Sequence, residues 1–430
     1  LYHGRILTMK EEDIFRGEVW IKNGQIVHII NYDNKNVFET RENIIWDREI
    51  DCQDNLIMPT FKNAHAHAPM TFLRSYADDL PLSSWLFEQV FPAEAKLEKD
   101  DIYHLSRVAL LEYLTSGIGA SFEMYYHPEE LAKAAVDMGF RMVLCSSSIG
   151  QLGENNSNLS KLEDEYNTYN HYHELISYHL GFHGEYTTSR EFISEIGQLA
   201  KKYKAPVYMH SQETKKEVDE CIMRHGMTPT KLFDELGIFD YGGGCFHMVH
   251  TNSEDMDIIK KRNVFIVTNP GSNTKLASGI APIGEFCRRD ISVAIGTDGP
   301  ASNNCLDMFR EMFLVTGLAK LLENDASAMK AENVLSMATV NGALALGLTS
   351  SDVLGIGKNA DLIIIDLHRP NMQPINNLKK NIVYSGSKEN IKMTMINGRI
   401  LYEDGRFADH IHVEEIYQKA NEITQRIFNR

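Results

Sequence analysis

The chain has 430 residues, of which 43% are hydrophobic and 24% are charged, a composition typical of a folded globular protein rather than a disordered or fibrous one. Its 43 basic residues are outnumbered by 59 acidic residues, and the resulting formal net charge of −16 makes nucleic acid or an anionic membrane a poor partner. No apolar stretch approaches the roughly 18 residues of a membrane-spanning helix. The six cysteines form no C-x-x-C pair, so we expect reduced thiols and a cytoplasmic protein.

Short alternating apolar runs occupy both ends of the chain. Near the N-terminus they surround the turn Asn23-Gly24, and near the C-terminus they surround Asn397-Gly398. Asn-Gly between two apolar runs is typical of a two-residue β-hairpin turn. We therefore predict that residues 1–55 and 352–408 together form one small β-sandwich domain.

Residues 56–351 alternate short apolar runs with amphipathic segments of helical length, as expected of repeated βα units. Eight strands are predicted: Leu56–Phe61, Ile118–Met124, Arg141–Ser146, Ile176–His183, Pro206–His210, Gly244–His247, Val264–Thr268 and Ser292–Gly296. This number favours an α/β fold with a closed (β/α)₈ TIM-like barrel, whose active site lies where the strands end. The alternative, a doubly wound open sheet, lacks a G-x-G-x-x-G motif after an early strand. Residues 409–430 are predicted to form a C-terminal surface helix.

Potential metal ligands follow several of the predicted strands. His65 and His67 are two residues apart, so an extended backbone places both imidazoles on one side, where they can bind the same cation. His210 and Asp298 end two later strands, and a barrel would bring all four groups to one mouth. Three histidines and a carboxylate suit zinc, with iron as an alternative. Taken singly, the histidines could be polar loop or core residues and Asp298 a helix N-cap.

Glu213 follows His210 closely enough to reach a metal-activated water without being a ligand. A carboxylate there can take a proton from that water and pass it to a substrate, although an acid at a helix start is more often solvated. His247 and His250 are candidates for a base or hydrogen-bond donor beside the metal. We favour His247 because it ends a predicted strand, whereas His250 lies in the following turn and would cap or pack.

These residues are embedded in longer motifs that resemble the amidohydrolase superfamily. The resemblance covers nearly the whole chain and is closest to the branch of 5′-methylthioadenosine/S-adenosylhomocysteine deaminases and related chlorohydrolases. The matching stretches are Asn63-Ala64-His65-Ala66-His67-Ala68-Pro69-Met70-Thr71, Ala77-Asp78-Asp79-Leu80-Pro81-Leu82 with Trp85-Leu86, Asn269-Pro270 with Ser272-Asn273, Lys275-Leu276-Ala277-Ser278-Gly279-Ile280-Ala281-Pro282, and Gly296-Thr297-Asp298-Gly299.

The resemblance implies one divalent metal ion and a division of catalytic roles. The implied ligands are His65, His67, His210 and Asp298. Glu213 would protonate the purine ring nitrogen, His247 would orient the attacking hydroxide, and Asp298 would assist proton movement to the departing ammonia. The resemblance also implies a small-molecule substrate and a homo-oligomer.

Three further residues match substrate-contacting positions of this branch. Glu94 and His183 match contacts to the ribose and to the distal part of the substrate, and Trp85 matches an aromatic residue near the pocket. Each has a plainer interpretation: Glu94 as a helix-surface charge, His183 as a polar loop residue, and Trp85 as core packing.

The chain also departs from the pattern of its closest resemblance. Close relatives carry arginines after the third barrel strand that can grip an amino-acid carboxylate, whereas this chain has Ser146 there and no arginine in the loop Gln151–Leu159. Without a bidentate clamp, 5′-methylthioadenosine or 5′-deoxyadenosine is a better expected substrate than S-adenosylhomocysteine. Glu123 stands where aspartate is usual.

Three functions are compatible with these observations. The first is a metal-dependent aminohydrolase that cleaves the C–N bond of a cyclic amidine, converting an adenine nucleoside to the inosine analogue and ammonia. The second keeps the site but acts as a chlorohydrolase, or as a deaminase of a triazine, pterin, guanine or cytosine-type ring. The third is a non-catalytic, metal-stabilised ligand-binding protein, for which Glu213 would have no evident use.

Overall fold

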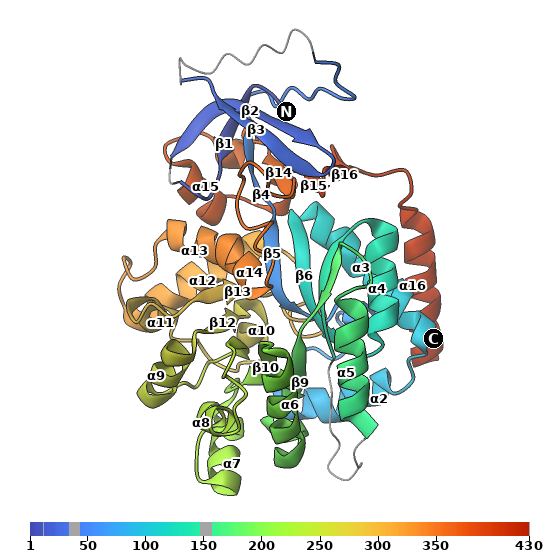
Figure 1. The fold of residues 1–430 in the computed structure, drawn as a ribbon, viewed down its shortest axis with the longest axis vertical. Helices are drawn as coiled ribbons and strands as arrows, with labels where there is room; N and C mark the ends of the chain where they lie inside the picture. The colour runs from blue at the N-terminus through green and yellow to red at the C-terminus, as the bar shows by residue number, and fades with distance from the viewer. Residues whose placement is uncertain (12, 34–43, 147–156, 430) are drawn as a thin grey trace.

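Strands from both ends of the chain form one sheet at the top of the molecule in Figure 1, a computed structural model that describes residues 1–11, 13–33, 44–146 and 157–429. The strands are β1 (Gly4–Leu7), β2 (Ile14–Lys22), β3 (Gln25–Asn31), β4 (Leu56–Pro59), β14 (Leu362–Ile365), β15 (Ile391–Ile396), β16 (Arg399–Glu403) and β17 (Arg406–Phe407). Their order is β17-β16-β15-β14-β4-β1-β2-β3, and every pair except the parallel β1 and β4 is antiparallel. The predicted module from both termini is therefore confirmed, with its strands hydrogen-bonded into a single sheet.

Both predicted hairpin turns are present. Asn23 and Gly24 have φ values of 51° and 79°, and Asn397 and Gly398 have values of 50° and 73°. Two successive left-handed residues are what a type I′ turn requires, and Asn-Gly adopts them at low cost. The turns thus fix how β2 pairs with β3 and how β15 pairs with β16.

Below this sheet, parallel strands form a barrel. They are β5 (Phe61–Ala66), β6 (Ile118–Tyr125), β7 (Arg141–Ser146), β8 (Ile176–Tyr178), β9 (Leu180–Gly184), β10 (Val207–Ser211), β11 (Gly243–His247), β12 (Val264–Thr268) and β13 (Val293–Ile295). The amide of His179, between β8 and β9, donates to the Leu144 carbonyl at 2.9 Å, and the Asp298 amide donates to the His65 carbonyl at 3.0 Å. These bonds link the two hydrogen-bonded groups β5-β6-β7-β8 and β13-β12-β11-β10-β9. With β8 and β9 counted as one interrupted strand, the (β/α)₈ barrel is confirmed.

Two predicted strands are divided differently from the prediction. The run expected to open the barrel, Leu56–Phe61, breaks at Thr60, so that β4 joins the terminal sheet and β5 begins the barrel. The run Ile176–His183 breaks at His179, with β8 paired to β7 and β9 paired to β10. Both runs are largely buried, so their apolar pattern contains no signal for a change of sheet. The domain limits remain predictions, although the pairing of β4 places residues 56–59 with the terminal sheet.

Helices surround the barrel and cover its mouth. The longer ones are α3 (Lys99–Thr115), α4 (Pro128–Met138), α5 (Ser157–Tyr169), α6 (Arg190–Tyr203), α7 (Lys215–His225), α8 (Pro229–Glu235), α9 (Ser253–Arg262), α12 (Met308–Glu323), α13 (Ala331–Ala338), α15 (Leu378–Tyr384) and α16 (Val413–Phe428). The shorter ones are η2 (Ala68–Leu73), α1 (Leu82–Ser84), the π-helix η3 (Trp85–Val90), α2 (Phe91–Glu94), η4 (Glu185–Thr187), α10 (Pro270–Lys275), α11 (Ile283–Arg288), α14 (Val340–Ala345), η5 (Pro370–Met372) and η6 (Lys388–Asn390). Several begin at side chains that accept a backbone N–H, as N-cap preferences predict: Ser189, Thr214, Thr228 and Asn252.

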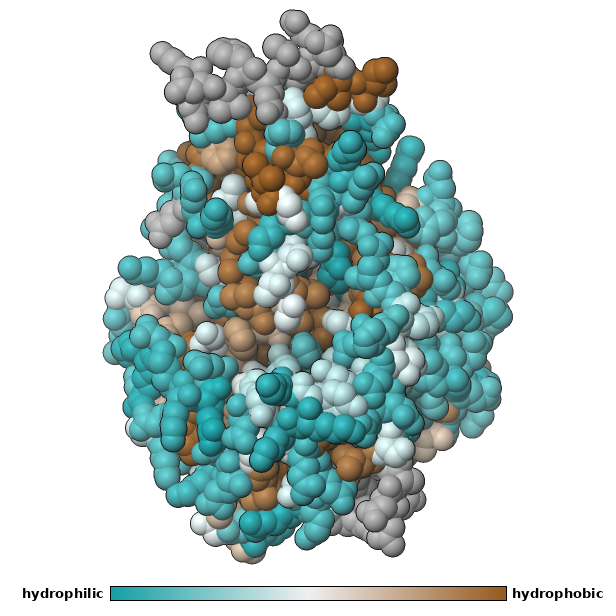
Figure 2. Space-filling model, in the orientation of Figure 1, coloured by the Kyte–Doolittle hydropathy of each residue, from teal (hydrophilic) through white to brown (hydrophobic). Residues whose placement is uncertain are grey.

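The predicted C-terminal helix is α16, which lies along α3 at the right of Figure 1. The ring of Phe428 stacks on that of Tyr76 with centroids 4.0 Å apart, and Arg426 pairs with Asp101 and Glu98. On the face drawn in Figure 2, hydrophobic surface gathers along the middle, from the terminal sheet towards the barrel, and the outer helices are mostly hydrophilic. None of the described helices is long and apolar enough to cross a membrane.

Candidate active site

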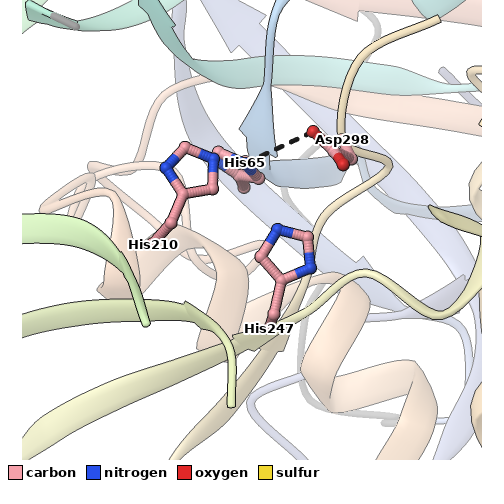
Figure 3. Close-up of side chains that lie close together, drawn as sticks. All are labelled: His65, His210, His247 and Asp298. Carbon is pink, nitrogen blue, oxygen red and sulfur yellow. Dashed lines mark ion pairs between the residues drawn. The ribbon is translucent and has the colours of Figure 1, made fainter. Parts of the chain in front are cut away.

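The ends of four barrel strands bring together a group of side chains that could bind a metal ion. Nitrogen and oxygen atoms of His65 on β5, His210 on β10, His247 on β11 and Asp298 after β13 all lie within 4.8 Å of one another, and Figure 3 shows these side chains pointing towards a common centre. One Asp298 oxygen, Oδ1, is 3.5 Å from His65 Nε2 and 3.2 Å from His67 Nε2. The group therefore contains three of the four predicted ligands together with His247, whereas the predicted ligand His67 lies outside it and contacts Asp298.

Three of the histidines are oriented by hydrogen bonds on the far side of the ring. Nδ1 of His67 lies 2.6 Å from the Met124 carbonyl, and Nδ1 of His210 lies 2.7 Å from the His183 carbonyl. Nδ1 of His247 lies 2.7 Å from Oδ1 of Asn273. Because each Nδ1 must donate its proton to an oxygen, each Nε2 keeps a free lone pair for the centre of the site, which is the usual arrangement around a protein-bound metal.

His65 provides the clearest test of whether a metal fits. Its side chain is fully buried, and neither ring nitrogen makes a hydrogen bond of standard geometry within the described part of the chain. The ring stacks on Phe246 with centroids 3.7 Å apart, and burial lowers its pKa to about 3. A neutral, buried imidazole without a hydrogen-bond partner is costly, whereas a divalent cation of the zinc type would accept its lone pair. The donor set and this orphaned ring together fit such an ion.

Asp298 is held as a carboxylate. Oδ2 accepts hydrogen bonds from the hydroxyls of Ser272 and Ser302 at 2.6 Å and 2.8 Å, and Oδ1 accepts one from the Gly299 amide at 2.8 Å. Burial alone would raise its pKa, but the contacts with His65 and His67 bring the pKa well below the usual value. The backbone at Asp298 has a φ of 60° and that at His247 a φ of 74°. Left-handed backbone at non-glycine residues is uncommon and often occurs at functional sites.

Glu213 lies at the edge of the cluster, two residues after β10. Its Oε1 accepts a hydrogen bond from the Ser278 hydroxyl at 3.1 Å, and its Oε2 is 3.9 Å from His247 Nε2. Burial raises its pKa, so the group retains a proton more readily than an exposed glutamate, as a proton shuttle requires. His250 binds the Ser278 carbonyl through Nε2 at 2.8 Å, and thus supports the loop that contacts Glu213.

A pocket with a volume of about 70 Å³, open to solvent at its mouth, is lined by His67, His210, His247 and Asp298 of this cluster. The three predicted substrate contacts, Trp85, Glu94 and His183, all line it. Its wall also contains apolar and phenolic side chains that were not predicted: Leu82, Leu86, Phe91, Tyr125, Tyr126 and Tyr186. Trp85 and Phe91 come from the short helices that follow Pro81, so this segment forms one wall of the cavity.

The polar groups of this cavity are adjusted by burial. Burial raises the pKa of Glu94 to about 7, and the hydroxyl of Tyr125 donates a hydrogen bond to its carboxylate. Burial lowers the pKa of His183 to about 3, and its Nδ1 lies 3.0 Å from the hydroxyl oxygen of Thr187. The cavity therefore offers an uncharged imidazole and a carboxyl group that titrates near neutral pH.

Comparison with known proteins agrees with this geometry. The sequence model of the Amidohydrolase family matches residues 56–401. This chain belongs to the amidohydrolase family. The family is metal-dependent, in keeping with the buried group of three histidines and one aspartate, and its members are hydrolytic enzymes.

Similar amidohydrolases have names that refer to adenine nucleosides. The chain is 36% identical to a 5-methylthioadenosine/S-adenosylhomocysteine deaminase of Thermoanaerobacter pseudethanolicus over 99% of this chain and 98% of that protein. It is 36% identical to a 5′-deoxyadenosine deaminase of Methanococcoides burtonii, again over 99% and 98% of the two chains. A solved structure of an adenosine deaminase from Xanthomonas campestris with bound zinc superposes with a TM-score of 0.92 at 28% identity, covering 99% and 98% of the two chains.

Several residues that shape this amidohydrolase site were given no role by the sequence. Ser272, Asn273 and Ser278 fall within motifs that carried the family resemblance, so a signal was present without a function attached to it. The carbonyls of Met124 and His183 leave no such signal, because any residue supplies one. Glu123 accepts the Ala68 amide at 2.7 Å and so ties the chain just after His67 to β6. The predicted absence of a carboxylate clamp concerns Ser146 and the loop to Leu159, of which residues 147–156 lie outside the described residues.

Proposed function

We propose that this amidohydrolase is a hydrolytic deaminase of adenine nucleosides with a small, uncharged 5′ substituent, such as 5′-methylthioadenosine or 5′-deoxyadenosine. The observation that carries the proposal is a buried acid, Glu213, that lines the same pocket as the metal-binding groups His210 and Asp298. The two deaminase relatives at 36% identity support the substrate class. The products would be the inosine analogue and ammonia.

We propose one metal ion, zinc in preference to iron, held by His65, His67, His210 and Asp298. When bound, such an ion supplies the Lewis acidity that makes water a nucleophile at neutral pH. The zinc in the Xanthomonas campestris structure supports this choice. Mixed nitrogen and oxygen ligands suit zinc better than calcium or magnesium, which prefer oxygen alone.

The side chains around the cluster would then move protons. Glu213 would deliver its proton to the ring nitrogen beside C6, with the carboxyl held by the Ser278 hydroxyl. His247, fixed by Asn273, would orient the incoming water, and Asp298 would assist the transfer of a water proton to the amino group. Water would contribute its oxygen to C6, where it becomes the carbonyl of the inosine analogue; one water proton would go to the amino nitrogen and the other would restore Glu213. The bond from C6 to the amino nitrogen breaks, and that nitrogen leaves as ammonia.

The remaining cavity residues would recognise the sugar and its substituent. Glu94 and Trp85 line the pocket; Glu94 would accept hydrogen bonds from ribose hydroxyls, and Trp85 would offer a flat apolar surface. His183 is neutral and can form a hydrogen bond with the substrate without attracting an anion. The apolar wall of Leu82, Leu86 and other residues favours a methylthio or methyl group at the 5′ position over a charged one.

The small-molecule role agrees with the other expectations from sequence. The formal charge of −16 opposes binding to nucleic acid, and all six cysteines are free, as expected for a reducing compartment. We propose that the enzyme works as a homo-oligomer in the cytoplasm, which sedimentation of the purified protein and fractionation of cells would test.

A substrate panel on metal-defined protein tests the proposed function. The panel contains 5′-methylthioadenosine, 5′-deoxyadenosine, S-adenosylhomocysteine, guanine, cytosine, a pterin and a chlorinated triazine, and ammonia and chloride are both measured. We expect ammonia from the first two compounds, its loss on chelation, and a loss in rate on the order of 10² to 10⁴ in Glu213→Gln. Glu220→Gln, at a partly exposed position on helix α7, serves as the matched control and should keep wild-type activity.

The same panel separates the competing functions. Chloride release from the triazine, or ammonia only from the other rings, would replace the proposal by the second function. Tight nucleoside binding without product, in either zinc-loaded or iron-loaded protein, would favour the ligand-binding protein. Undiminished turnover in Glu213→Gln would refute the role given to that residue.

A further inference from the structure

The turn that presents Glu213 to the cavity begins with a strained residue. β10 ends at Ser211, and the next residue, Gln212, has a φ of 54°, a conformation that residues other than glycine rarely adopt. The Gln212 side chain is completely engaged: Nε2 donates to Asp255 Oδ2 and to the His250 carbonyl, both at 2.9 Å, and Oε1 accepts from the Thr230 hydroxyl. Such a conformation persists only when its surroundings enforce it. The contacts of the Gln212 side chain therefore keep this turn in its strained conformation, directly before Glu213.

The carboxylate of Glu217 also holds this turn in place, through the backbone. Oε1 of Glu217 accepts the Gln212 amide at 2.7 Å, and Oε2 accepts the Glu213 amide at 2.9 Å. Glu217 is buried, and it is the third residue of α7, whose N-cap is Thr214. The backbone N–H groups of Gln212 and Glu213, the two residues before the N-cap, are thus both bound by the Glu217 side chain.

This contact differs from ordinary helix capping. In a capping box, the acid at the third helical position bonds the backbone N–H of the N-cap residue itself, which here is Thr214. The Glu217 carboxylate instead reaches past Thr214 to the two residues before it. The start of the helix can be stabilised without hydrogen bonds from Glu217 to the Gln212 and Glu213 amides. Fixing the backbone of Glu213 requires them.

We propose that Glu217 is a positioning residue, which holds the carboxyl group of Glu213 at its place beside the metal-binding cluster. This inference rests on the proposed function. Within the described part of the chain, the Ser278 hydroxyl is the one hydrogen-bond donor to the Glu213 side chain, so the backbone must supply the rest of its orientation. A displacement of about 1 Å in a reacting group can slow a reaction by about 100-fold.

The variant Glu217→Gln tests the pair of contacts with little change in volume. An amide offers one oxygen, so it can accept one of the two N–H groups and turns its own NH₂ towards the other. We expect kcat to fall by about 10- to 100-fold while KM for 5′-methylthioadenosine and the metal content stay close to wild type. Asp219→Asn, an exposed position on the same helix that pairs with Lys215 at 2.6 Å, is the matched control and should leave kcat unchanged.

Two further variants separate positioning from stability. Thr214→Ala removes the N-cap of α7 and should lower the melting temperature without reducing kcat. Glu217→Asp keeps two acceptor oxygens on a shorter side chain, so its kcat should lie between those of wild type and Glu217→Gln. If Glu217→Gln does not fold, Glu217→Asp is tested in its place. Equal rates in wild type and Glu217→Asp would overturn the proposal.

A double variant shows whether Glu217 acts through Glu213. If it does, the pair Glu213→Gln/Glu217→Gln should be no slower than Glu213→Gln alone, because residues that act as a unit have non-additive effects. A further loss of about 10-fold or more in the double variant would overturn the proposal, as would wild-type kcat in Glu217→Gln.

A structural readout distinguishes this inference from the proposed function. Ammonia release by the wild-type protein tests the function alone. Independently of activity, a crystal structure of Glu217→Gln should show the Glu213 carboxyl displaced from the Ser278 hydroxyl. An unchanged position of that carboxyl would overturn the inference even if the deaminase activity is confirmed.

Discussion

The hydrogen bond between His247 and Asn273 allows a quantitative prediction about the site. Both side chains are buried, at 1% and 2% exposure, and Nδ1 of the histidine lies 2.7 Å from Oδ1 of the asparagine. Asn273→Ala leaves that N–H without a partner away from water, which costs about 1 to 3 kcal/mol. If the cost falls on the transition state, kcat/KM drops by about 5- to 150-fold, in line with the 10- to 100-fold losses typical of residues that orient groups around a metal.

The assay is ammonia release from 5′-methylthioadenosine by protein of measured metal content. Asn273→Asp is the matched comparison, because it keeps an acceptor oxygen of nearly the same size, and it should lose less activity than Asn273→Ala. Melting temperatures identify any effect that is due to unfolding. A kcat/KM for Asn273→Ala within about threefold of wild type would show that the orientation of His247 does not govern the reaction.

Three further outcomes are expected. Asp361→Asn should lower the free energy of unfolding in urea by about 3 to 5 kcal/mol, because it leaves Arg141 buried without its carboxylate at 2.7 Å. Burial opposes ionisation of Asp361, but Arg141 brings the pKa of Asp361 below the usual value. The stabilisation that the Asp361 carboxylate gives the folded protein is therefore present above the pKa of the unfolded state and lost as pH falls through the pKa of the folded state. Equal acid sensitivity of Asp361→Asn and wild type would contradict this. The pKa of Glu94 is about 7, so KM for nucleosides should fall as pH rises from about 6 to 8 and stay flat in Glu94→Gln; a parallel pH dependence in the variant would exclude Glu94. His67→Ala should lose bound metal by elemental analysis while His247→Ala retains it, and the opposite pattern would reverse their assignments.

The architecture could largely be predicted because hydrophobic runs and turn residues encode strands locally. The Asn-Gly turns and the alternation of apolar runs with helical segments led directly to the terminal sheet and the barrel. The breaks at Thr60 and His179 could not be predicted, since buried strands on either side of each break have the same apolar character. Which sheet a strand joins depends on pairing with distant residues, such as the register of β4 with β14.

The sequence predicted most of the reactive side chains of the candidate site, but few of the contacts that orient them. His65, His210 and Asp298 stand at strand ends, where a barrel gathers side chains, and they were predicted from residue type and position; His247, which joins them in place of His67, was predicted only as a base or hydrogen-bond donor. Their orientation depends on features that leave little trace in a sequence. These include backbone carbonyls as hydrogen-bond acceptors, the left-handed backbone of Asp298, and the reach of a carboxylate four residues beyond Glu213.

The source of the oxygen in the product shows whether the enzyme hydrolyses an adenine nucleoside at C6. Zinc-loaded protein is incubated with 5′-methylthioadenosine in ¹⁸O-labelled water, and the purine product is analysed by mass spectrometry together with the ammonia released. We expect one labelled oxygen at C6 for each ammonia formed, and the loss of both in Glu213→Gln and in chelated protein. Product without label, or labelled product formed equally well by Glu213→Gln, would contradict this expectation.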